Sequence, residues 1–309
     1  SGVTDYKHPN DQACLDSIKK IMSMLGAPQH AGFDRIKPAQ PKKTIDELYG
    51  ILPDNREKPY DMRDIIERIV DDSEFEEYKK LYGQSILCGL ARIEGWAVGI
   101  VANQRKVVKS KKGEMQFGGV IYSDSADKAS RFIMNCNQKK IPLVFLQDVT
   151  GFMVGSRSEQ GGIIKDGAKM VNAMANSVVP KFTIVIGNSY GAGNYAMCGK
   201  AYDPRLIYAW PSAKIAVMGG AQAAKVLLQI QEASLKAKGE IITPEKEAEL
   251  LKDITDRYNS QTTPYYAASR LWVDGIINPI ETRKVIAMGI EAANQSPIKK
   301  AFNVGVIQT

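Results

Sequence analysis

Glycine, serine and alanine are spaced in one short stretch of the sequence, residues 182–197 (FTIVIGNSYGAGNYAM), in a way that fits three kinds of chemistry. A G-x-S-x-G pattern centred on Ser189 is typical of the nucleophile turn in serine hydrolases. A G-x-G-x-x-A pattern that begins at Gly191 is typical of dinucleotide binding. In the third interpretation, the turn presents bare backbone N–H groups that stabilise an oxyanion without any catalytic side chain.

The first two interpretations need partner residues that the sequence lacks at the required places. A hydrolase with this turn places its histidine after the nucleophile, but the two histidines are His8 and His30. A dinucleotide site needs an acidic residue about 20 residues beyond the glycines to bind the ribose. Asp203 comes too early, and residues 209–213 (AWPSA) contain no acid. An NAD-binding oxidoreductase is therefore only a weak alternative.

The third interpretation needs only small residues at the start of a helix. Ala192 and Gly193 are small enough for a ligand oxygen to reach their N–H groups. The helix expected from about Asn194 adds the positive end of its dipole. Gly151 and Phe152 follow another apolar stretch and supply a second pair of such groups. The alternative for each turn is that its glycines only permit tight packing between a strand and a helix.

Apolar stretches that alternate with amphipathic ones predict the elements that hold these turns. Residues 141–148 and 182–187 are expected to be buried strands, with helices at 128–137 and 162–177. The other expected elements are a hairpin of strands 86–93 and 96–103 around Glu94-Gly95, strands 207–210 and 215–218, and helices 61–71, 221–237 and 244–258, the last capped by Thr243. This order predicts an α/β fold with parallel strands, in which ligands bind where strands end and helices begin.

The first 43 residues differ from the rest of the chain. Residues 11–25 predict a lone amphipathic helix, and the prolines and lysines of residues 37–43 (KPAQPKK) predict a linker. Residues 44–309 show no comparable break, so we expect them to form one domain. A chain that opens in this way is expected to have lost a preceding domain.

Composition argues against several classes of protein. With 44% hydrophobic and 24% charged residues the chain suits a folded domain. No apolar run approaches the roughly 20 residues of a membrane span, and the polar start gives no sign of a signal peptide. The four cysteines match neither a zinc site nor a disulfide framework, so we expect no metal and a reducing compartment such as the cytoplasm.

The net charge of +7 favours an anionic partner. Much of the excess lies in a stretch that includes Arg105, Lys106 and Lys109. The alternatives for this stretch are a solvated loop and a site for phosphates such as those of coenzyme A. No aromatic residues are interleaved with these cations, so nucleic acid is a poor fit.

Long runs of specific residues allow the chain to be compared with known families. The runs are residues 92–103 (RIEGWAVGIVAN), 147–155 (QDVTGFMVG), 161–170 (GGIIKDGAKM), the turn at Gly191, 209–213 (AWPSA) and 217–220 (VMGG). In this order they resemble the carboxyltransferase (β) subunits of biotin-dependent acyl-CoA carboxylases, in particular the 3-methylcrotonyl-CoA carboxylase branch. The resemblance implies a crotonase-like (ClpP/crotonase) α/β fold, a spiral of ββα units.

The resemblance also implies a reaction and its sites. Carboxybiotin, delivered on a carrier domain of another chain, releases carbon dioxide when its ureido oxygen is stabilised, and the acyl-CoA substrate then captures it. Ala192 and Gly193 would supply the backbone N–H groups of the oxyanion hole for the biotin carbonyl. The residues that line the same pocket would be Gly151, Phe152, Gly191 and Asn194.

The resemblance further implies partners, because the family's subunits are about twice as long and contain two such domains. Residues 1–43 then resemble the tail of an absent N-terminal domain plus a linker, and residues 44–309 the C-terminal carboxyltransferase domain. The implied partners are a biotin carboxylase and biotin carrier subunit, the N-terminal carboxyltransferase half, and further copies in a homo-oligomer, a hexamer of full-length β subunits. The implied location is the cytoplasm, or the mitochondrial matrix in a eukaryote. Neither a nucleic acid nor a membrane is an expected partner.

Two alternatives use the same fold. A biotin-dependent acyl-CoA decarboxylase subunit would share the residues named above. A crotonase-type enoyl-CoA hydratase would need carboxylate bases, for which Glu159, Asp148 and Asp166 are the candidates. Asp148 and Asp166 are more often structural, through capping or a buried ion pair. Methylcrotonyl-CoA-like and propionyl-CoA-like substrates both stay open, because the family's members share these backbone groups.

Overall fold

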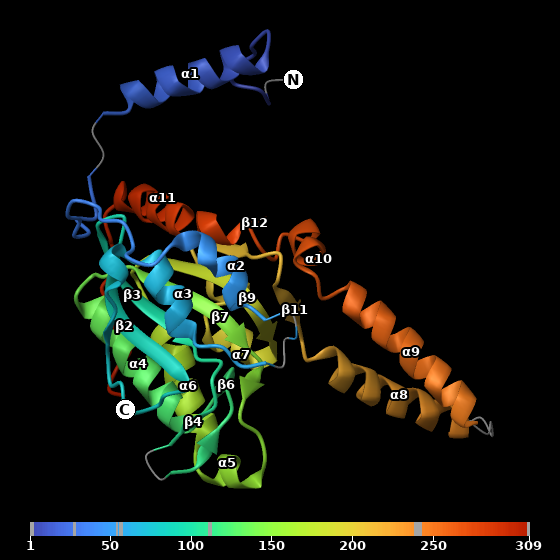
Figure 1. Cartoon of the computed structure of the whole chain (residues 1–309). Helices are drawn as coiled ribbons and strands as arrows, with labels where there is room; N and C mark the ends of the chain where they lie inside the picture. Colours follow the sequence, from blue (N-terminus) through green and yellow to red (C-terminus); the bar gives the residue numbers. More distant parts are fainter. Residues whose placement is uncertain are drawn as a thin grey trace.

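The computed structural model describes residues 3–26, 29–53, 55, 58–110, 113–237 and 243–307. Among them an eight-stranded sheet organises the fold (Figure 1). Its strands are β1 (Glu76–Glu77), β2 (Ile86–Ile93), β3 (Trp96–Asn103), β7 (Leu143–Val149), β9 (Lys181–Tyr190), β10 (Leu206–Ala209) and β12 (Gly275–Ile276) in spatial order, with β11 (Lys214–Ala216) paired to the end of β9. β2 is antiparallel to its neighbours, whereas the pairs from β3 to β12 are parallel. The predicted α/β fold with parallel strands is confirmed.

The hairpin of β2 and β3 forms with the predicted bounds and turn. Ile93 pairs with Trp96, so two residues make the turn. These are Glu94 and Gly95, with φ of 50° and 81°. Positive φ at both positions matches the twist of the flanking strands.

Successive residues of the central strands pack on opposite faces of the sheet. In β7, Val144 and Leu146 belong to one hydrophobic core, and Leu143 and Phe145 belong to the other. The first face is covered by α3 (Met62–Ile69) and α11 (Thr282–Asn294), and the second by α4 (Ser123–Gln138), α6 (Ile163–Ala175) and α7 (Gly191–Ala196) (Figure 1). The sheet therefore lies between two layers of helices, and this packing holds the carboxyl ends of β7 and β9 in place.

Shorter elements surround the sheet. β4 (Val108–Lys109) pairs with β5 (Met115–Gln116), and β6 (Val120–Ile121) pairs with β8 (Gly151–Phe152). The short helices are η1 (Ile45–Glu47), α2 (Leu48–Ile51), η2 (Asp71–Ser73), α5 (Ser156–Gln160), η3 (Lys200–Tyr202), α10 (Pro264–Ser269) and η4 (Pro279–Glu281). Within the described ranges, no helix combines the length and apolar character that crossing a membrane requires.

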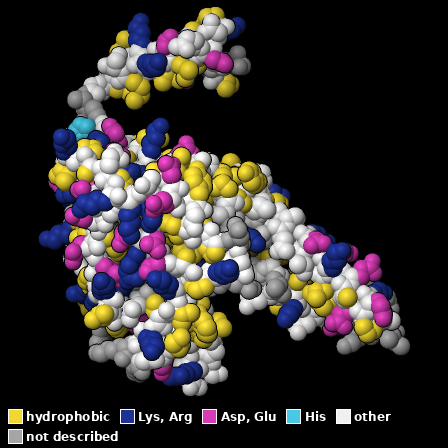
Figure 2. All heavy atoms as spheres, in the orientation of Figure 1, with side chains coloured by type: hydrophobic (Ala, Val, Ile, Leu, Met, Phe, Trp, Pro, Cys, Tyr) yellow, Lys and Arg dark blue, Asp and Glu magenta, His cyan; other side chains and the backbone are white. Residues whose placement is uncertain are grey.

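α1 (Asp11–Met24) lies apart from the rest of the molecule, and none of its residues is buried (Figure 1). It coincides with the predicted amphipathic helix. Its apolar side chains, such as Leu15, Ile18 and Met22, are more than half exposed, and Figure 2 shows hydrophobic atoms along one side of the helix.

Residues 31–39, which we name the strap, lie along the domain. Phe33 is 7% exposed in the first core, and Ile36 N–H donates to Gly95 O over 3.1 Å. The strap precedes the predicted domain boundary at residue 44 and overlaps the predicted linker at 37–43. The residues that the strap contacts, such as Gly95, lie far away in the sequence, so the local pattern of prolines and lysines does not predict these contacts.

α8 (Gly220–Ala237) and α9 (Pro244–Ser260) form a hairpin that projects from the sheet (Figure 1). The hairpin has a small core of its own, made by Ala224, Leu228 and Ile254. Thr243 caps α9 as predicted, because its side chain accepts a hydrogen bond from Lys246 N–H.

Candidate active site

The two turns that the sequence singled out meet at the carboxyl ends of β7 and β9. β7 leads through Thr150 into Gly151, and β9 leads directly into Gly191, the first residue of α7. A Cβ atom on Gly193 would lie 2.6 Å from Val149 Cγ2 and 3.1 Å from Gly151 Cα. At these distances a side chain at position 193 would force the two turns apart, so the close approach needs a glycine.

The start of α7 has the small residues and the helix end that the oxyanion interpretation requires. Ala192 and Gly193 are its second and third residues, so α7 begins three residues earlier than predicted from Asn194. The N–H groups of a first turn have no acceptor within their own helix and carry the positive end of the dipole. Gly191 has φ +49°, and a Cβ there would lie 2.8 Å from Val217 O, so the tight entry into α7 also needs glycine.

Two cavities share α7 as a wall. The first, which we name the Trp272 cavity, measures about 640 Å³, and its lining includes Gly191, Val217, Tyr258, Tyr266 and Trp272. The second, the Phe152 cavity, measures about 410 Å³, and its lining includes Phe152, Val154, Ile164 and Val171. Ala192 and Tyr195 line both cavities. One short helix therefore separates two mostly apolar spaces of the size that binds small molecules.

Ser189 is fully buried and belongs to a chain of hydrogen bonds below α7. Its hydroxyl donates to Gln147 Oε1 over 2.6 Å and accepts from Asn194 Nδ2 over 2.7 Å. Gln147 Nε2 in turn donates to Met197 O over 2.7 Å. Ser189 therefore holds α7 against β7 and is not placed as a nucleophile. Asn194, predicted to contact the cofactor, lines the Trp272 cavity, but its amide is engaged with Ser189.

The three carboxylates considered as bases have different surroundings. Asp148 is buried and accepts hydrogen bonds from Tyr60 Oη and Asn188 N–H, each over 2.8 Å. Asp166 forms an ion pair with Lys169 over 2.9 Å, and this hydrogen bond raises the pKa of Lys169. Both acids are thus structural, the alternative that the sequence favoured. Glu159 is exposed and lines the Phe152 cavity.

The basic stretch does not form one patch. Arg105 is largely buried, and its Nε lies 3.3 Å from Asp148 Oδ2, so its guanidinium is directed into the domain. Lys106 Nζ lies 2.8 Å from Asp61 Oδ2, and Lys109 is exposed. Burial alone would raise the pKa of the Asp61 carboxyl, but hydrogen bonds from Lys106 and Gln104 lower it below its usual value. None of the three basic residues lines the Trp272 or the Phe152 cavity.

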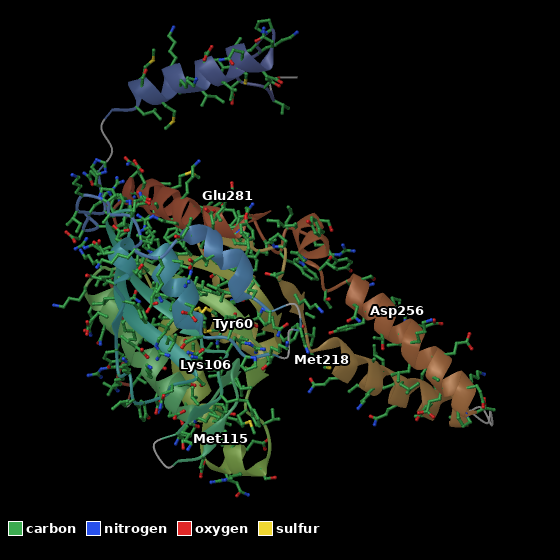
Figure 3. The ribbon with its side chains drawn as sticks, in the orientation of Figure 1. Tyr60, Lys106, Met115, Met218, Asp256 and Glu281 are labelled. Atoms are coloured by element: carbon green, nitrogen blue, oxygen red, sulfur yellow. The ribbon has the colours of Figure 1, made fainter. Side chains whose placement is uncertain are left out.

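The aromatic residues of the Trp272 cavity were not predicted from the sequence. Tyr258 lies in the last turn of α9, Tyr266 lies in α10, and Trp272 follows α10. Tyr258 Oη donates to Met218 O over 3.0 Å and so fixes the base of the hairpin, where Figure 3 shows Met218. The only signal in the sequence was the density of aromatic residues between 258 and 272.

Comparison with known proteins gives consistent matches. A family model described as the carboxyl transferase domain matches residues 1–304. The mitochondrial methylcrotonoyl-CoA carboxylase beta chain of Dictyostelium discoideum is 44% identical over 298 residues, which cover 96% of this chain and 48% of that protein. The chain thus spans about half the length of the curated relatives that it matches.

Two solved structures support the same grouping. The beta subunit of geranyl-CoA carboxylase from P. aeruginosa superposes with a TM-score of 0.78 at 39% identity, over 99% of this chain and 55% of that chain. Transcarboxylase 12S, described as a hexamer assembly with hydrolysed methylmalonyl-coenzyme A bound, superposes with a TM-score of 0.73 at 35% identity, over 96% of this chain and 55% of that chain.

Proposed function

This chain belongs to the carboxyl transferase domain family, and from that membership we propose that it is the C-terminal half of the carboxyltransferase component of a biotin-dependent acyl-CoA carboxylase. The predicted family and the crotonase-like α/β fold are confirmed. The activity is a proposal, because the relatives are about twice as long.

The observation that carries the proposal is that Ala192 lines two cavities at once. Carboxyl transfer between biotin and an acyl-CoA needs two ligands whose reacting atoms come within about 3–3.5 Å of each other. Tyr195 also lines both cavities, but Ala192 is the small residue of this wall and lies at the helix start, so ligands in the two cavities can approach the same backbone N–H groups. An enoyl-CoA hydratase would need no second cavity.

The residues of the two turns fit the ureido ring of biotin. A Cβ atom on Gly151 would have nothing within 4 Å, so the space beside this backbone is open. Biotin, when bound with a carboxyl group on its ureido nitrogen, supplies the carbon dioxide and a base. The Ala192 and Gly193 N–H groups would donate to the ureido oxygen. Phe152 lines the Phe152 cavity, Gly191 lines the Trp272 cavity, and Asn194 holds α7 through Ser189. Two such donors are worth about 3 kcal/mol each in comparable oxyanion holes.

For the acyl-CoA we propose a branched, unsaturated acyl group. Two relatives with higher identity than transcarboxylase 12S are named for methylcrotonoyl-CoA and geranyl-CoA, and the aromatic Trp272 cavity suits an apolar chain. Lys106 and Lys109 are our candidates for contacts with the CoA phosphates. Arg105 supports the site from within through Asp148 instead.

The partners that we propose come from the names and lengths of the relatives. We expect a biotin carboxylase and a biotin carrier on other chains, an N-terminal carboxyltransferase half, and a hexameric assembly such as the one described for transcarboxylase 12S. We propose the cytoplasm as its location, or the mitochondrial matrix in a eukaryote, since the Dictyostelium relative is named as mitochondrial.

The proposal is tested with the chain, the N-terminal half of the Dictyostelium protein as a separate polypeptide, and a carboxylated biotin carrier. We expect labelled carboxyl to pass to 3-methylcrotonyl-CoA or geranyl-CoA faster than to propionyl-CoA. If the two halves do not associate, a fusion in which this chain replaces the matching part of the Dictyostelium protein serves the same assay. Hydration of an enoyl-CoA in the absence of biotin, with no carboxyl transfer, would contradict the proposal.

The variant Ala192→Val tests the shared wall. Ala192 is exposed, so the added methyl groups should change stability by less than about 0.5 kcal/mol. They should lower kcat for carboxyl transfer about 100-fold, because they displace the ligand from its donors. The matched control is Ala233→Val, which is exposed on α8 and lines neither cavity. An equal loss in both variants would show that the wall has no special role.

A further inference from the structure

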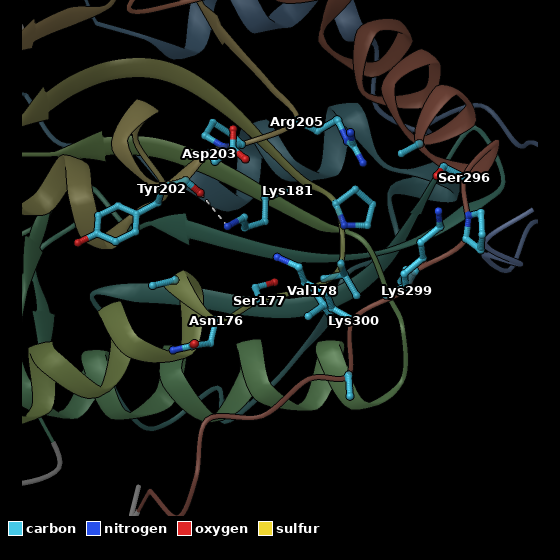
Figure 4. A pocket seen from close by; sticks show the side chains of 18 of the residues that line it. Asn176, Ser177, Val178, Lys181, Tyr202, Asp203, Arg205, Ser296, Lys299 and Lys300 are labelled. Atoms are coloured by element: carbon cyan, nitrogen blue, oxygen red, sulfur yellow. Dashed lines mark hydrogen bonds between the residues drawn. The ribbon is translucent and has the colours of Figure 1, made fainter.

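A third cavity lies at the amino-terminal end of β9, whereas the two turns follow the carboxyl ends of β7 and β9. We name it the basic cavity. It measures about 990 Å³, and its lining comes from the start of β9, the residues just before β10 and the residues that follow α11. Its four cationic residues are Lys181, Arg205, Lys299 and Lys300 (Figure 4). β9 has 10 residues, so at about 3.3 Å per residue Lys181 lies about 30 Å along the strand from the start of α7. On the side of η3 the cavities are neighbours, because Ala201 also lines the Trp272 cavity and Tyr202 also lines the Phe152 cavity.

Lys181 forms the buried floor of this cavity. Lys181 is only 7% exposed. Its ammonium donates to Met174 O over 3.3 Å and to Tyr202 O over 2.8 Å, the second of which Figure 4 shows. An ammonium has three N–H donors, so one donor is left beyond these two. Lys181 also neutralises the carbonyl end of α6, where Met174 lies.

The other three cations are not needed to cap the helices that end here. At the end of α11, Asn294 O accepts from Ala31 N–H over 2.8 Å, and Asn294 Oδ1 accepts from Gly32 and Phe33 N–H, each over 3.1 Å. At the end of α6, Asn172 O accepts from Asn176 N–H. Lysines near the carboxyl end of a helix often donate hydrogen bonds to its last carbonyl groups. Here other N–H groups donate at these helix ends instead.

Arg205, Lys299 and Lys300 also form no ion pair with a carboxylate in the part of the chain that the structure describes. Asp203 is the single acid among the described lining residues. Four cations thus face one carboxylate around a concave space. Such an excess of one sign in a cleft concentrates ions of the opposite sign.

We propose that the basic cavity binds a phosphorylated small molecule through a pyrophosphate-type group. The three exposed cations Arg205, Lys299 and Lys300 match the charge of a pyrophosphate, and Arg205 offers the planar pair of donors that suits phosphate oxygens. The volume of the cavity leaves room for more than the phosphates. The basic cavity borders the two cavities at α7 through η3, but the proposal does not depend on the carboxyltransferase assignment.

The test is calorimetric titration of the chain with inorganic phosphate, pyrophosphate and ADP. We expect saturable binding with one site per chain for pyrophosphate and ADP, and weaker binding for phosphate. ADP binding at least tenfold tighter than pyrophosphate identifies a nucleotide as the ligand, whereas equal affinities identify the pyrophosphate group as sufficient. Absence of saturable binding by both pyrophosphate and ADP overturns the proposal.

Variants locate the binding. Lys299→Gln/Lys300→Gln should weaken pyrophosphate binding at least tenfold, and Arg205→Gln alone should weaken it by a smaller factor. All three residues are exposed, so the fold should be unaffected, which thermal melting checks. The matched control is Lys252→Gln/Lys284→Gln, which removes the same charge from exposed positions outside the cavity. An equal loss in the control would mean that pyrophosphate is attracted only by the net charge, and the proposal would fail.

Discussion

Gly193 and Gly151 have no side chains, yet they decide how closely the turns that follow β7 and β9 approach each other. Gly193 lies against Val149 and Gly151 with no room for a Cβ atom. Gly151 has open space around it but a φ of +145°, which residues with a side chain rarely adopt. The two glycines are therefore required for different reasons, one for space and the other for backbone conformation.

Gly193→Ala should cost about 1–3 kcal/mol of unfolding free energy, because the methyl group must push β7 and α7 apart. Gly151→Ala should cost about 1 kcal/mol, from backbone conformation alone. Urea unfolding measures both, through the midpoint at unchanged m. The control is Gly50→Ala in α2, where a Cβ atom meets nothing within 4 Å and φ is not positive, so stability should stay equal or rise. A Gly193→Ala protein as stable as the original would contradict the packing argument.

How much of the site the sequence could predict depended on whether its residues are neighbours in the chain. The place of Ala192 and Gly193 near a helix start could be predicted, because their small size and their position after an apolar strand are local properties. Trp272 was missed because α10 and the end of α9 bring it to the cavity from about 80 residues further along the chain, and no local pattern encodes that contact. Arg105 was given a surface role because charge alone does not reveal burial beside Asp148.

At the scale of elements, the central strands were predicted to within a few residues because apolar runs report burial on both faces. α11 was not predicted, although Ile286, Ile290 and Ala293 have helical spacing on its buried face. Gly289 interrupts that pattern, and a Cβ there would lie 2.5 Å from Phe182 Cε1. Tight packing on β9 thus selected a residue that lowers helix propensity, and tertiary contacts outweighed the local preference.

A buried ion pair joins the strap to the rest of the domain. Arg283 of α11 lies 2.7 Å from Asp71, and their side chains are 6% and 5% exposed. Arg283 also donates to Ala39 O in the strap, and Asp71 accepts from the N–H groups of Ala39 and Gly95. The pair therefore holds the strap, α11 and the β2–β3 turn together.

Arg283→Met should lower the unfolding free energy by about 3–5 kcal/mol, since it leaves the Asp71 carboxylate buried without a cation. The control is Lys200→Met, which breaks an exposed pair with Asp274 over 3.0 Å and should cost no more than about 1 kcal/mol. Thermal and urea unfolding of both variants measure the difference. Equal and small effects would show that the strap is held by its backbone hydrogen bonds alone.

At the scale of the whole molecule, three of the four cysteines are buried in the fold and one is exposed on α1. Burial raises the pKa of Cys88 to about 12, of Cys136 to about 12 and of Cys198 to about 11, from an ordinary value of 9.0. The folded state therefore keeps these protons at pH values where the unfolded chain has lost them.

Between pH 9 and about 11, the unfolded state binds fewer protons than the folded state, so the unfolding free energy should fall as pH rises. Urea unfolding at several pH values in this window measures the fall. Cys88→Ala removes one of the three thiols and should make the fall less steep. At pH 8, iodoacetamide should label Cys14 in the folded protein and the other cysteines only after unfolding. A stability that is constant up to pH 11 would contradict the burial of the thiols.

The short helix η3 lies between the basic cavity, the Trp272 cavity and the Phe152 cavity. Ala201 lines the basic cavity and the Trp272 cavity, and Tyr202 lines the basic cavity and the Phe152 cavity. Cys198 and Asp203, near its two ends, have left-handed backbones, with φ of 61° and 49°, which fix the short turn. A substitution that widens one cavity at Tyr202 therefore reshapes another, whereas Trp272 and Val171 each line only one of these three cavities, so substitutions there change the cavities one at a time.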